Sequence, residues 1–455
     1  MNKYVVILAA GRGTRMKSLD AVHSKISYPI MGKPILEYVL DAVEPLEFNK
    51  TIVVAGFGGE TTKQIVGDRA KVIQEDELSE TASTVNMARK DLKDKKGQTL
   101  IVYGDIPLIT THTLKRVFKK HEKNGNGLTI LTSVLTNPDG YARIVREHKS
   151  NLVLSVREEE ELDEYQKTDL NEVNAGVYLF DNELLFKYLN ANVHSVSNLV
   201  EKFVKSGIKT EAYVLEDPEE MYSINNRVQL AYAAKVIRKR VNHDLMMSGV
   251  SIEDPDTTYI SPDVTIEQDS IIMPNTTIVG KTKIGKNNWL GPNTYINNVT
   301  MGDGNVISFS WLSDVTLGNV NHVGPFAKIY AESELGNNND VGNFVELKKT
   351  KLGNEIFAKH LSYLGDASIG DRTNIGCMSV TANYDGVNKH QTLIGNNVFI
   401  GTGSILIAPV TVEDNAFVAA GTVVTKDVKD GELAIAREEQ KNVPGGAKKV
   451  LGKRK

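Results

Sequence analysis

An aliphatic residue recurs at every sixth position through most of the second half of the chain. An α-helix repeats every 3.6 residues and a strand every two, so neither element explains this period. A triangular solenoid explains it, because each side of a coil takes six residues and turns one aliphatic side chain inward. The positions are Ile260, Ile266, Ile272, Ile278, Ile284, Leu290 and Ile296, then Leu317, Val323, Ile329, Leu335, Val341 and Leu347, then Ile369 and Ile375, then Ile394, Ile400, Leu406, Val412, Val418 and Val424.

Two segments interrupt this register, and we expect both to be loops or irregular coils that leave the solenoid. They are residues 348–364 and residues 380–389. Loops that project from a rigid scaffold often carry functional side chains. These two segments are therefore where we expect the chemistry of the second half.

The first half alternates short apolar runs with helical patterns. Strands are expected at 4–8, 51–55, 99–103 and 128–132, and helices at 34–43 and 113–123. This alternation is typical of βαβ units and predicts an α/β Rossmann-like fold with a mostly parallel sheet. In such sheets ligands bind beyond the carboxyl ends of the strands. One long helix over 227–249 is expected to join the two halves.

Composition excludes several classes of function. The chain has 455 residues, 41% of them hydrophobic and 24% charged, which predicts two or three globular domains. A net charge of −4 argues against nucleic acid as a partner, because phosphate backbones bind concentrated basic surfaces. The single cysteine, Cys377, rules out an intrachain disulfide and suits a reducing compartment. No apolar run reaches the ~20 residues of a membrane span, so we expect a cytoplasmic protein.

The sequence LAAGRGTRM, starting at Leu8, follows the first expected strand. It is not a Walker A loop, because no Gly-Lys-Ser/Thr follows, and it lacks the third glycine of a dinucleotide fingerprint. Small residues still let backbone N–H groups approach an anion, and Arg12 and Arg15 add positive charge. Asp105, just after the expected strand 99–103, is either a functional carboxylate or a helix cap. The sequence therefore predicts a phosphate site at this edge of the sheet.

This motif resembles that of nucleoside-diphosphate-sugar pyrophosphorylases. With the hexapeptide half, the whole chain resembles the bacterial bifunctional N-acetylglucosamine-1-phosphate uridylyltransferase/glucosamine-1-phosphate acetyltransferases. Further matching motifs are GNFVELKK (342–349), HLSYLGD (360–366), NIGC (374–377) and NYDGVNKH (383–390). The resemblance implies a pyrophosphorylase domain at 1–226, a helical linker at 227–249, a left-handed parallel β-helix acetyltransferase domain at 250–437 and a tail at 438–455.

The resemblance implies that the chain makes UDP-N-acetylglucosamine, a precursor for cell-wall synthesis. Acetyl-CoA would acetylate glucosamine 1-phosphate, and UTP would then react with N-acetylglucosamine 1-phosphate and release pyrophosphate, with Mg²⁺ as cofactor. A homotrimer with its acetyl site between subunits is also implied. Two alternatives stay open: only one half is active, or the chain is a non-catalytic scaffold or regulatory subunit.

The resemblance also assigns roles to particular residues. Arg15 and Lys25 would neutralise the triphosphate, and His360, oriented by Glu346, would be the general base of acetyl transfer. The implied nucleotide and sugar contacts are Leu8, Ala9, Ala10, Gly11, Lys25, Gln74, Thr81, Tyr103, Gly104, Asp105, Ala142, Asn174 and Asn225, with Asp105 and Asn225 as metal ligands. The implied acetyl-acceptor contacts are Lys348, Tyr363, Asn374, Asn383, Tyr384 and Lys389. The implied acetyl-CoA contacts are Cys377, Thr402, Ala420 and Arg437.

Three of the chain's departures from the family pattern are substitutions at single positions of the expected sites. Ala142 stands where the family has glycine, and Arg157 stands where it has a glutamate that contacts the sugar. Tyr330 stands where it has a phosphate-binding arginine. Lys328 and the lysines at 348 and 389 are the candidates to replace that positive charge.

Overall fold

The computed structural model describes residues 1–18, 24–75, 80–147, 150–190 and 192–452, so the last three residues of the expected tail lie outside it. The chain divides into two compact units, Met1–Ile237 and Arg238–Lys455. The division falls inside the long helix α9 (Arg227–Met247). The helix itself was expected from the sequence. The finer domain bounds stay predictions. No helix in the described part of the chain is long and apolar enough to cross a membrane.

The first unit contains a mixed sheet of nine strands among its described residues. The four strands expected from the sequence are confirmed as β1 (Lys3–Ala9), β4 (Lys50–Ala55), β6 (Gln98–Tyr103) and β7 (Leu128–Val134). Strands β1, β4, β5 (Lys71–Gln74) and β6 are parallel, whereas β10 (Glu172–Asp181) runs antiparallel between β6 and β7. The path is β11 (Thr210–Val214), β7 (Leu128–Val134), β10 (Glu172–Asp181), β6 (Gln98–Tyr103), β1 (Lys3–Ala9), β4 (Lys50–Ala55) and β5 (Lys71–Gln74), with β8 (Arg143–Arg146) and β9 (Val153–Arg157) beside β10.

Apolar side chains bury both faces of this sheet. In β1, Val6 and Leu8 belong to one hydrophobic cluster, while Val5 and Ile7 belong to another. A strand buried on both faces reads as a continuous apolar run, which is why β1 was recognisable in the sequence. The helices are α1 (Ile35–Val43), α2 (Gly59–Val66), α3 (Thr81–Asn86), α4 (Arg89–Leu92), α5 (Thr111–Asn124), α6 (Glu164–Asp169), α7 (Asn182–Tyr188) and α8 (Val196–Lys205).

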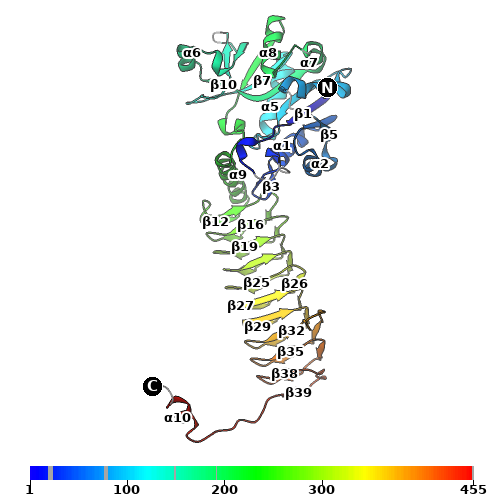
Figure 1. The fold of residues 1–455 in the computed structure, drawn as a ribbon, viewed down its shortest axis with the longest axis vertical. Coiled ribbons are helices and arrows are strands. Elements are labelled where there is room, and N and C mark those ends of the chain that lie inside the picture. Colours follow the sequence, from blue (N-terminus) through cyan, green and yellow to red (C-terminus); the bar gives the residue numbers. More distant parts are fainter. Residues whose placement is uncertain (19–23, 76–79, 148–149, 191, 453–455) are drawn as a thin grey trace. The chain divides into compact units, whose positions relative to one another are not determined.

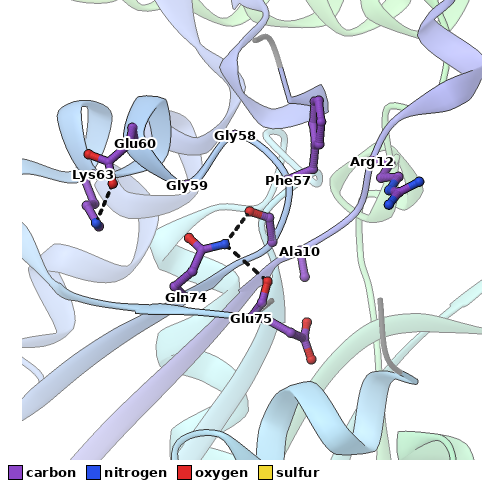
Figure 2. A pocket seen from close by; sticks show the side chains of 10 residues that line it. Ala10, Arg12, Phe57, Gly58, Gly59, Glu60, Lys63, Gln74 and Glu75 are labelled. Carbon is purple, nitrogen blue, oxygen red and sulfur yellow. Dashed lines mark hydrogen bonds and ion pairs between the residues drawn. The ribbon is translucent and has the colours of Figure 1, made fainter. Parts of the chain in front are cut away.

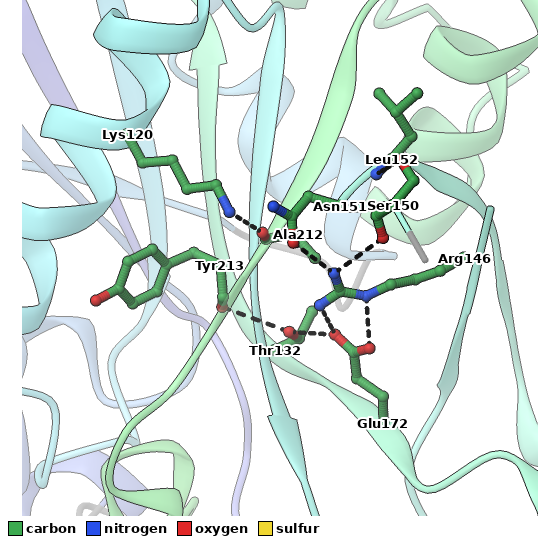
Figure 3. A network of polar contacts seen from close by, with 9 residues as sticks. All are labelled: Lys120, Thr132, Arg146, Ser150, Asn151, Leu152, Glu172, Ala212 and Tyr213. Atoms are coloured by element: carbon green, nitrogen blue, oxygen red, sulfur yellow. Dashed lines mark hydrogen bonds and ion pairs between the residues drawn. The ribbon is translucent and has the colours of Figure 1, made fainter. Parts of the chain in front are cut away.

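The β8–β9 hairpin is tied to the sheet by an ion pair as well as by backbone pairing. Arg146 donates from Nε and Nη2 to the two oxygens of Glu172 in β10, at 2.6 and 2.5 Å (Figure 3). The hydroxyl group of Thr132 in β7 donates to the same carboxylate at 2.5 Å. Such a bidentate contact fixes both distance and orientation, so the hairpin is held against two strands at once.

The second unit is a parallel β-helix, which confirms the fold expected from the six-residue period. Figure 1 shows its coils stacked from β12 (Ser251–Ile252) to β39 (Leu433–Ala434). Inward aliphatic side chains such as Ile278, Leu290 and Ile329 are fully buried. The residue before each one faces outward: Trp289 and Lys328 are exposed, and Thr277 is partly exposed.

Asparagine side chains form a second ladder inside the β-helix. Asn305 donates to Asn288 Oδ1, Asn321 donates to Asn305 Oδ1, and Asn339 donates to Asn321 Oδ1, each at 3.0 Å. These Oδ1 atoms also accept backbone N–H groups from the following coil. Burying a polar group is unfavourable unless it forms a hydrogen bond. The ladder supplies hydrogen bonds to the buried polar groups at a corner of the coil that the apolar stack does not fill.

The expectation for residues 348–364 was wrong. Their segment stays in the solenoid and forms β28 (Lys351–Leu352) and β29 (Phe357–Gly365), which pairs with β27 (Asp340–Lys348). Leu364 pairs with Leu347 at a spacing one residue short of three sixes, so the period breaks although the stacking does not.

The expectation of a loop over residues 380–389 was wrong for residues 380–382 and right for the residues that follow. β32 (Val380–Ala382) continues the coil, and then a loop projects before β33 (Thr392–Ile394) resumes it. A bridge between Tyr384 and Lys389 closes that loop.

Replacing Ile329 with alanine should destabilise the second unit by about 2–5 kcal/mol, because it leaves a cavity in a close-packed stack. Denaturant unfolding followed by hydrogen exchange would show the loss in the β-helix. Thr316→Ala, which changes an outward side chain in the same unit, is the control, and its free energy of unfolding should stay close to that of the parent. Equal losses in the two variants would contradict the inward role of Ile329.

Candidate functional site

The carboxyl ends of four parallel strands meet at one edge of the first unit. Leu8 pairs with Tyr103, and Ala55 pairs with Gln74. The Gly104 N–H also donates to the Leu8 carbonyl oxygen at 2.8 Å, which keeps β1 and β6 together beyond their ends. A cavity of about 230 Å³ opens there, and most of its lining was expected from the sequence. It is lined by Leu8, Ala9, Ala10, Gly11, Lys25, Ile26, Thr81, Thr84, Tyr103 and Asp105.

A second cavity, of about 450 Å³, shares Ala10 with the first (Figure 2). Gln74 lines it and donates from Nε2 to the backbone oxygens of Gly56 and Glu75, at 2.9 and 3.2 Å. A Cβ at Gly59 would lie 1.8 Å from Gln74 Oε1, so the side chain lies directly against α2 at a position that only glycine allows. These contacts use both N–H groups of the amide and fix its plane in the wall of the cavity.

Four polar side chains converge beside the first cavity. Lys25 Nζ is bonded to Asp105 Oδ2, and it also donates to Asn225 Oδ1 at 3.0 Å. Arg15 Nη2 donates to the same Asn225 oxygen at 2.9 Å. Asn225 reaches this place because the Ile224 N–H donates to the Asp105 carbonyl oxygen at 2.9 Å. The structure thus brings together residues that lie far apart in the sequence.

The oxygens of Asp105 and Asn225 fit a divalent cation. Both contact the one ammonium group of Lys25, so both lie within reach of a single positive charge. The side chains of Lys25 and Asp105 are only 12% and 16% exposed, which strengthens that electrostatic attraction. Mg²⁺ prefers oxygen ligands and is often held by one or two protein groups together with substrate phosphates. Among the described residues, no group of three or more His, Cys, Asp or Glu is placed so that it could hold a metal ion by itself.

The loop after β1 owes its shape to Gly13. Gly13 has a φ of +66°, and a Cβ there would lie 2.6 Å from Lys25 Cβ. Glycine adopts this left-handed conformation without steric cost and leaves room for the lysine. The 3₁₀ turns Thr14–Met16 and Lys25–Ser27 then present Arg15 and Lys25 to the cluster.

Tyr103 and Asn174 lie farther along the same edge. Asn174 Nδ2 donates to the Tyr178 hydroxyl oxygen at 2.5 Å, and the backbone N–H of Asn174 donates to the Ala142 carbonyl oxygen at 2.9 Å. Burial raises the pKa of Tyr103 to about 12, so its hydroxyl group stays neutral and bonds to Thr81. Ala142 contributes a backbone oxygen here, a contact that does not depend on its side chain. Arg157 lies exposed at the end of β9.

The second group of expected residues lies mainly on one face of the β-helix, which we call the β25 face. This face comprises β25 (Lys328–Ile329), the ends of β27 and β29, and β32. Glu346 pairs with Lys328 on one side and with Tyr363 on the other, and Lys348 pairs with Gly365. Asn374 lies on a different face, in β31 (Asn374–Ile375).

Tyr363 and Asn383 meet over Gly365. A Cβ at Gly365 would lie 2.4 Å from the Tyr363 hydroxyl oxygen and 2.8 Å from Asn383 Nδ2. Asn383 also donates to Asp366 Oδ2 at 2.5 Å. Glycine is therefore required at position 365 if these two side chains are to form one polar wall.

The loop over residues 383–390 is organised by Asp385, which sequence reasoning missed. Its carboxylate accepts hydrogen bonds from the Val387 and Asn388 N–H groups at 2.8 and 2.6 Å, and lies 2.7 Å from His390 Nε2. These bonds lower the pKa of Asp385 to about 2. The Asp-Gly pair in NYDGVNKH was the signal that could have revealed this turn. The loop presents Tyr384 and Lys389, both exposed.

A corner of the β-helix beside the β25 face stacks His360 and the expected coenzyme A contacts in successive coils. The Met378 N–H donates to the Leu361 carbonyl oxygen, the Gly403 N–H to Cys377, and the Gly421 N–H to Thr402, at 2.7–2.8 Å. His360, Cys377, Thr402 and Ala420 therefore form one column, and Arg437 Nη1 donates to the Ala420 carbonyl oxygen at 2.7 Å.

Not every expected contact occurs within one chain. His360 is exposed, and no hydrogen bond between its imidazole and Glu346 is found among the described residues. Glu346 Oε2 instead accepts a long hydrogen bond of 3.5 Å from the Tyr330 hydroxyl group.

Comparisons with known proteins agree with both halves of the chain. Residues 5–170 match the family described as MobA-like NTP transferase domain, and residues 391–426 match bacterial transferase hexapeptide (six repeats). Proteins named "Bifunctional protein GlmU" match almost end to end. One from an Exiguobacterium species is 41% identical over 99% of this chain and 100% of its own length. Others from a Geobacillus species and from Shouchella clausii are 42% and 40% identical, over 97% and 98% of this chain and 97% and 99% of their own lengths.

Asp385 should titrate at about pH 2 in the folded chain rather than near its ordinary value of 3.8. Because its folded-state pKa is lowered, the stabilisation of the loop is complete above about pH 4 and is lost as pH falls from there through 2. Carbon-13 NMR of the carboxyl group, assigned with Asp385→Asn, would measure this. A midpoint near 3.8 would mean that the turn does not form in solution.

Proposed function

The chain belongs to the family of bifunctional GlmU proteins, and on this basis we propose that it makes UDP-N-acetylglucosamine through two separate active sites. The first unit is a nucleotidyltransferase, and the second is a hexapeptide β-helix. The observation that carries the first assignment is the convergence of Arg15, Lys25, Asp105 and Asn225 at the carboxyl edge of the sheet. Two cations and two oxygen ligands beside a small-residue loop suit a nucleoside triphosphate and its metal.

In the proposed uridylyl transfer, a phosphate oxygen of N-acetylglucosamine 1-phosphate attacks the α-phosphorus of UTP and pyrophosphate leaves. The step brings like charges together, so positive charge must be supplied around the phosphates. Lys25 and Arg15 would release Asp105 and Asn225 and bind the phosphate oxygens instead. The cavity beside Gln74 would hold the uracil ring, and the region of Tyr103 and Asn174 would hold the sugar.

Mg²⁺ is the proposed cofactor of this first site. Asp105 and Asn225 would hold it, together with oxygens of the nucleotide. When bound, it supplies Lewis-acid neutralisation of phosphate charge.

In the proposed acetyl transfer, the amine of glucosamine 1-phosphate attacks the thioester carbon of acetyl-CoA. The C–S bond then breaks, and coenzyme A leaves as the thiolate, which takes up a proton. His360 would take the proton from the amine, since imidazole titrates near neutral pH. Lys348, Lys389, Tyr363 and Asn383 would bind the sugar phosphate. The column of Cys377, Thr402 and Ala420, with Arg437 at its end, would bind coenzyme A.

We also propose that three copies of the chain assemble along one corner of the β-helix. That corner carries an apolar ridge in five successive coils: Phe309, Phe326, Phe344, Leu361 and Met378, whose side chains are 39–59% exposed. The rings of Phe326 and Phe344 stack at 5.3 Å, nearly parallel. A continuous exposed apolar ridge of this kind is typical of a protein interface. His360 lies next to it in the sequence, so a neighbouring copy could complete its surroundings.

The remaining alternatives, one active half or a scaffold without activity, are favoured by no particular observation. A scaffold gains nothing from keeping the Lys25–Asp105–Asn225 cluster. It also gains nothing from holding Tyr363 and Asn383 over a required glycine.

Replacing Asp105 with asparagine should lower uridylyl transfer by about 100-fold or more and leave acetyl transfer unchanged. Replacing His360 with alanine should lower acetyl transfer by about 10²–10⁴-fold and leave uridylyl transfer unchanged. Pyrophosphate release and coenzyme A release, measured separately, would report the two activities. Asp68→Asn and His243→Ala, both exposed, are the matched controls. Loss of both activities in either variant would contradict two independent sites.

Replacing Phe326 with aspartate should break the assembly into monomers, because it buries a charge in the apolar ridge. Sedimentation velocity would measure the mass. Val320→Asp changes an exposed apolar residue outside the ridge and should keep the trimer. A parent protein that sediments as a monomer would refute this proposal without affecting the assignment of uridylyl transfer.

A further inference from the structure

Four outward side chains on the β25 face form a compact patch, which we call the lysine–tyrosine patch. Lys328 and Tyr330 belong to one coil, and Glu346 and Lys348 belong to the next. Lys328 pairs with Glu346, and the Tyr330 N–H donates to the Leu347 carbonyl oxygen at 2.9 Å, which brings Tyr330 beside Lys348. The two lysines therefore lie on one diagonal of the patch, and Tyr330 and Glu346 lie on the other.

Both lysines lean on the same aromatic ring. Lys328 Nζ lies 4.5 Å from the centroid of the Tyr330 ring, and Lys348 Nζ lies 5.4 Å from it. Ammonium groups are attracted to the electron-rich face of an aromatic ring, so the Tyr330 ring keeps both charges close to itself. Trp311, one coil earlier, gives Lys328 a weaker second contact at 6.0 Å.

Neither ammonium group is neutralised by a carboxylate within the described ranges of the chain. The acidic member of the patch, Glu346, accepts a hydrogen bond from the Tyr330 hydroxyl group, at 3.5 Å. Other outward lysines of the β-helix have acidic partners: Lys351 pairs with Glu334, and Lys359 pairs with Asp340. Two positive charges held together without a counterion repel each other, and an anion with several oxygens would relieve that repulsion.

A cavity of about 350 Å³ adjoins the patch. Glu346 and Tyr363 line it together with Phe344, Leu361, Ser362, Met378 and Val380. Tyr363 pairs with Glu346 in the next coil and meets Asn383 over Gly365. A ligand with its anionic end on the two lysines would therefore extend toward the polar wall of Tyr363 and Asn383, where hydroxyl groups of a sugar can be bonded.

We propose that Lys328 is a further phosphate-binding residue, in addition to Lys348 and Lys389, for the sugar phosphate that accepts the acetyl group. It acts with Lys348, and Tyr330 is the positioning residue that holds both ammonium groups. This inference rests on the proposed acetyl transfer. A phosphate monoester carries between one and two negative charges near neutral pH, so the two ammonium groups of the patch can neutralise it.

The test is direct binding of glucosamine 1-phosphate to the full chain by calorimetry. Replacing Lys328 with alanine should weaken binding by about 10- to 100-fold, because a hydrogen bond between two charged groups is lost. Lys328→Arg should bind within a few-fold of the parent. Lys351→Ala, an outward lysine on another face, should bind as the parent does.

The role of Tyr330 is tested by coupling. Tyr330→Phe keeps the ring and should bind nearly as well as the parent, whereas Tyr330→Leu should bind more weakly. The double variant Lys328→Ala/Tyr330→Leu should lose less than the two single losses combined, because both changes disturb the same ammonium group. Full additivity would remove Tyr330 as the positioning residue.

Two results separate this inference from the proposed function. If the parent binds glucosamine 1-phosphate but releases no coenzyme A, the proposed acetyl transfer is wrong. The proposed phosphate site is then decided by whether the Lys328 variants bind glucosamine 1-phosphate more weakly than the parent. If acetyl transfer occurs and Lys328→Ala binds as tightly as the parent, the inference is wrong and the function stands. A parent that neither binds nor reacts overturns both.

Discussion

Coil-on-coil stacking of inward aliphatic side chains is the constraint on which the second half of the molecule depends. Because Ile329 and Leu347 are buried at paired positions, the residues on either side of them must face outward in fixed columns. The lysine–tyrosine patch, the wall over Gly365 and the corner column of His360 all follow from that registration. None of them requires a long side-chain network, since the backbone pairing already sets their spacing.

In the first half of the molecule, the site residues are brought together at one edge of the sheet and not by stacked coils. Four parallel strands end at one edge, and the chain returns there through Ile224, whose N–H group bonds to the backbone oxygen of Asp105. One backbone hydrogen bond thus joins a residue near the end of the unit to the end of β6. Glycines at 13 and 59 then allow Lys25 and Gln74 to lie against neighbouring loops. The cluster depends on close backbone approach more than on any single ionic contact.

Much of this could be predicted from the sequence, for identifiable reasons. The strands around Leu8 and Tyr103 are apolar on both faces, and the six-residue period appears in the sequence alone. The coil that contains His360 was misjudged because counting in sixes cannot distinguish a shortened corner from a departing loop. Asp385 was missed because its role is to bond its own turn. The contact of Tyr330 with two lysines could not be foreseen, since it depends on which residues of adjacent coils become neighbours.

The corner column has a consequence for molecular length. Successive coils are about 4.8 Å apart, so Cys377, Thr402 and Ala420 together span about 10 Å along the axis of the β-helix. The length of a ligand bound along such a column therefore determines how many coils it contacts: a short ligand contacts one coil, and an elongated ligand contacts several. Lengthening or shortening the solenoid beyond Ala420 by one coil would change how long a molecule the chain can grip without altering any residue that does chemistry.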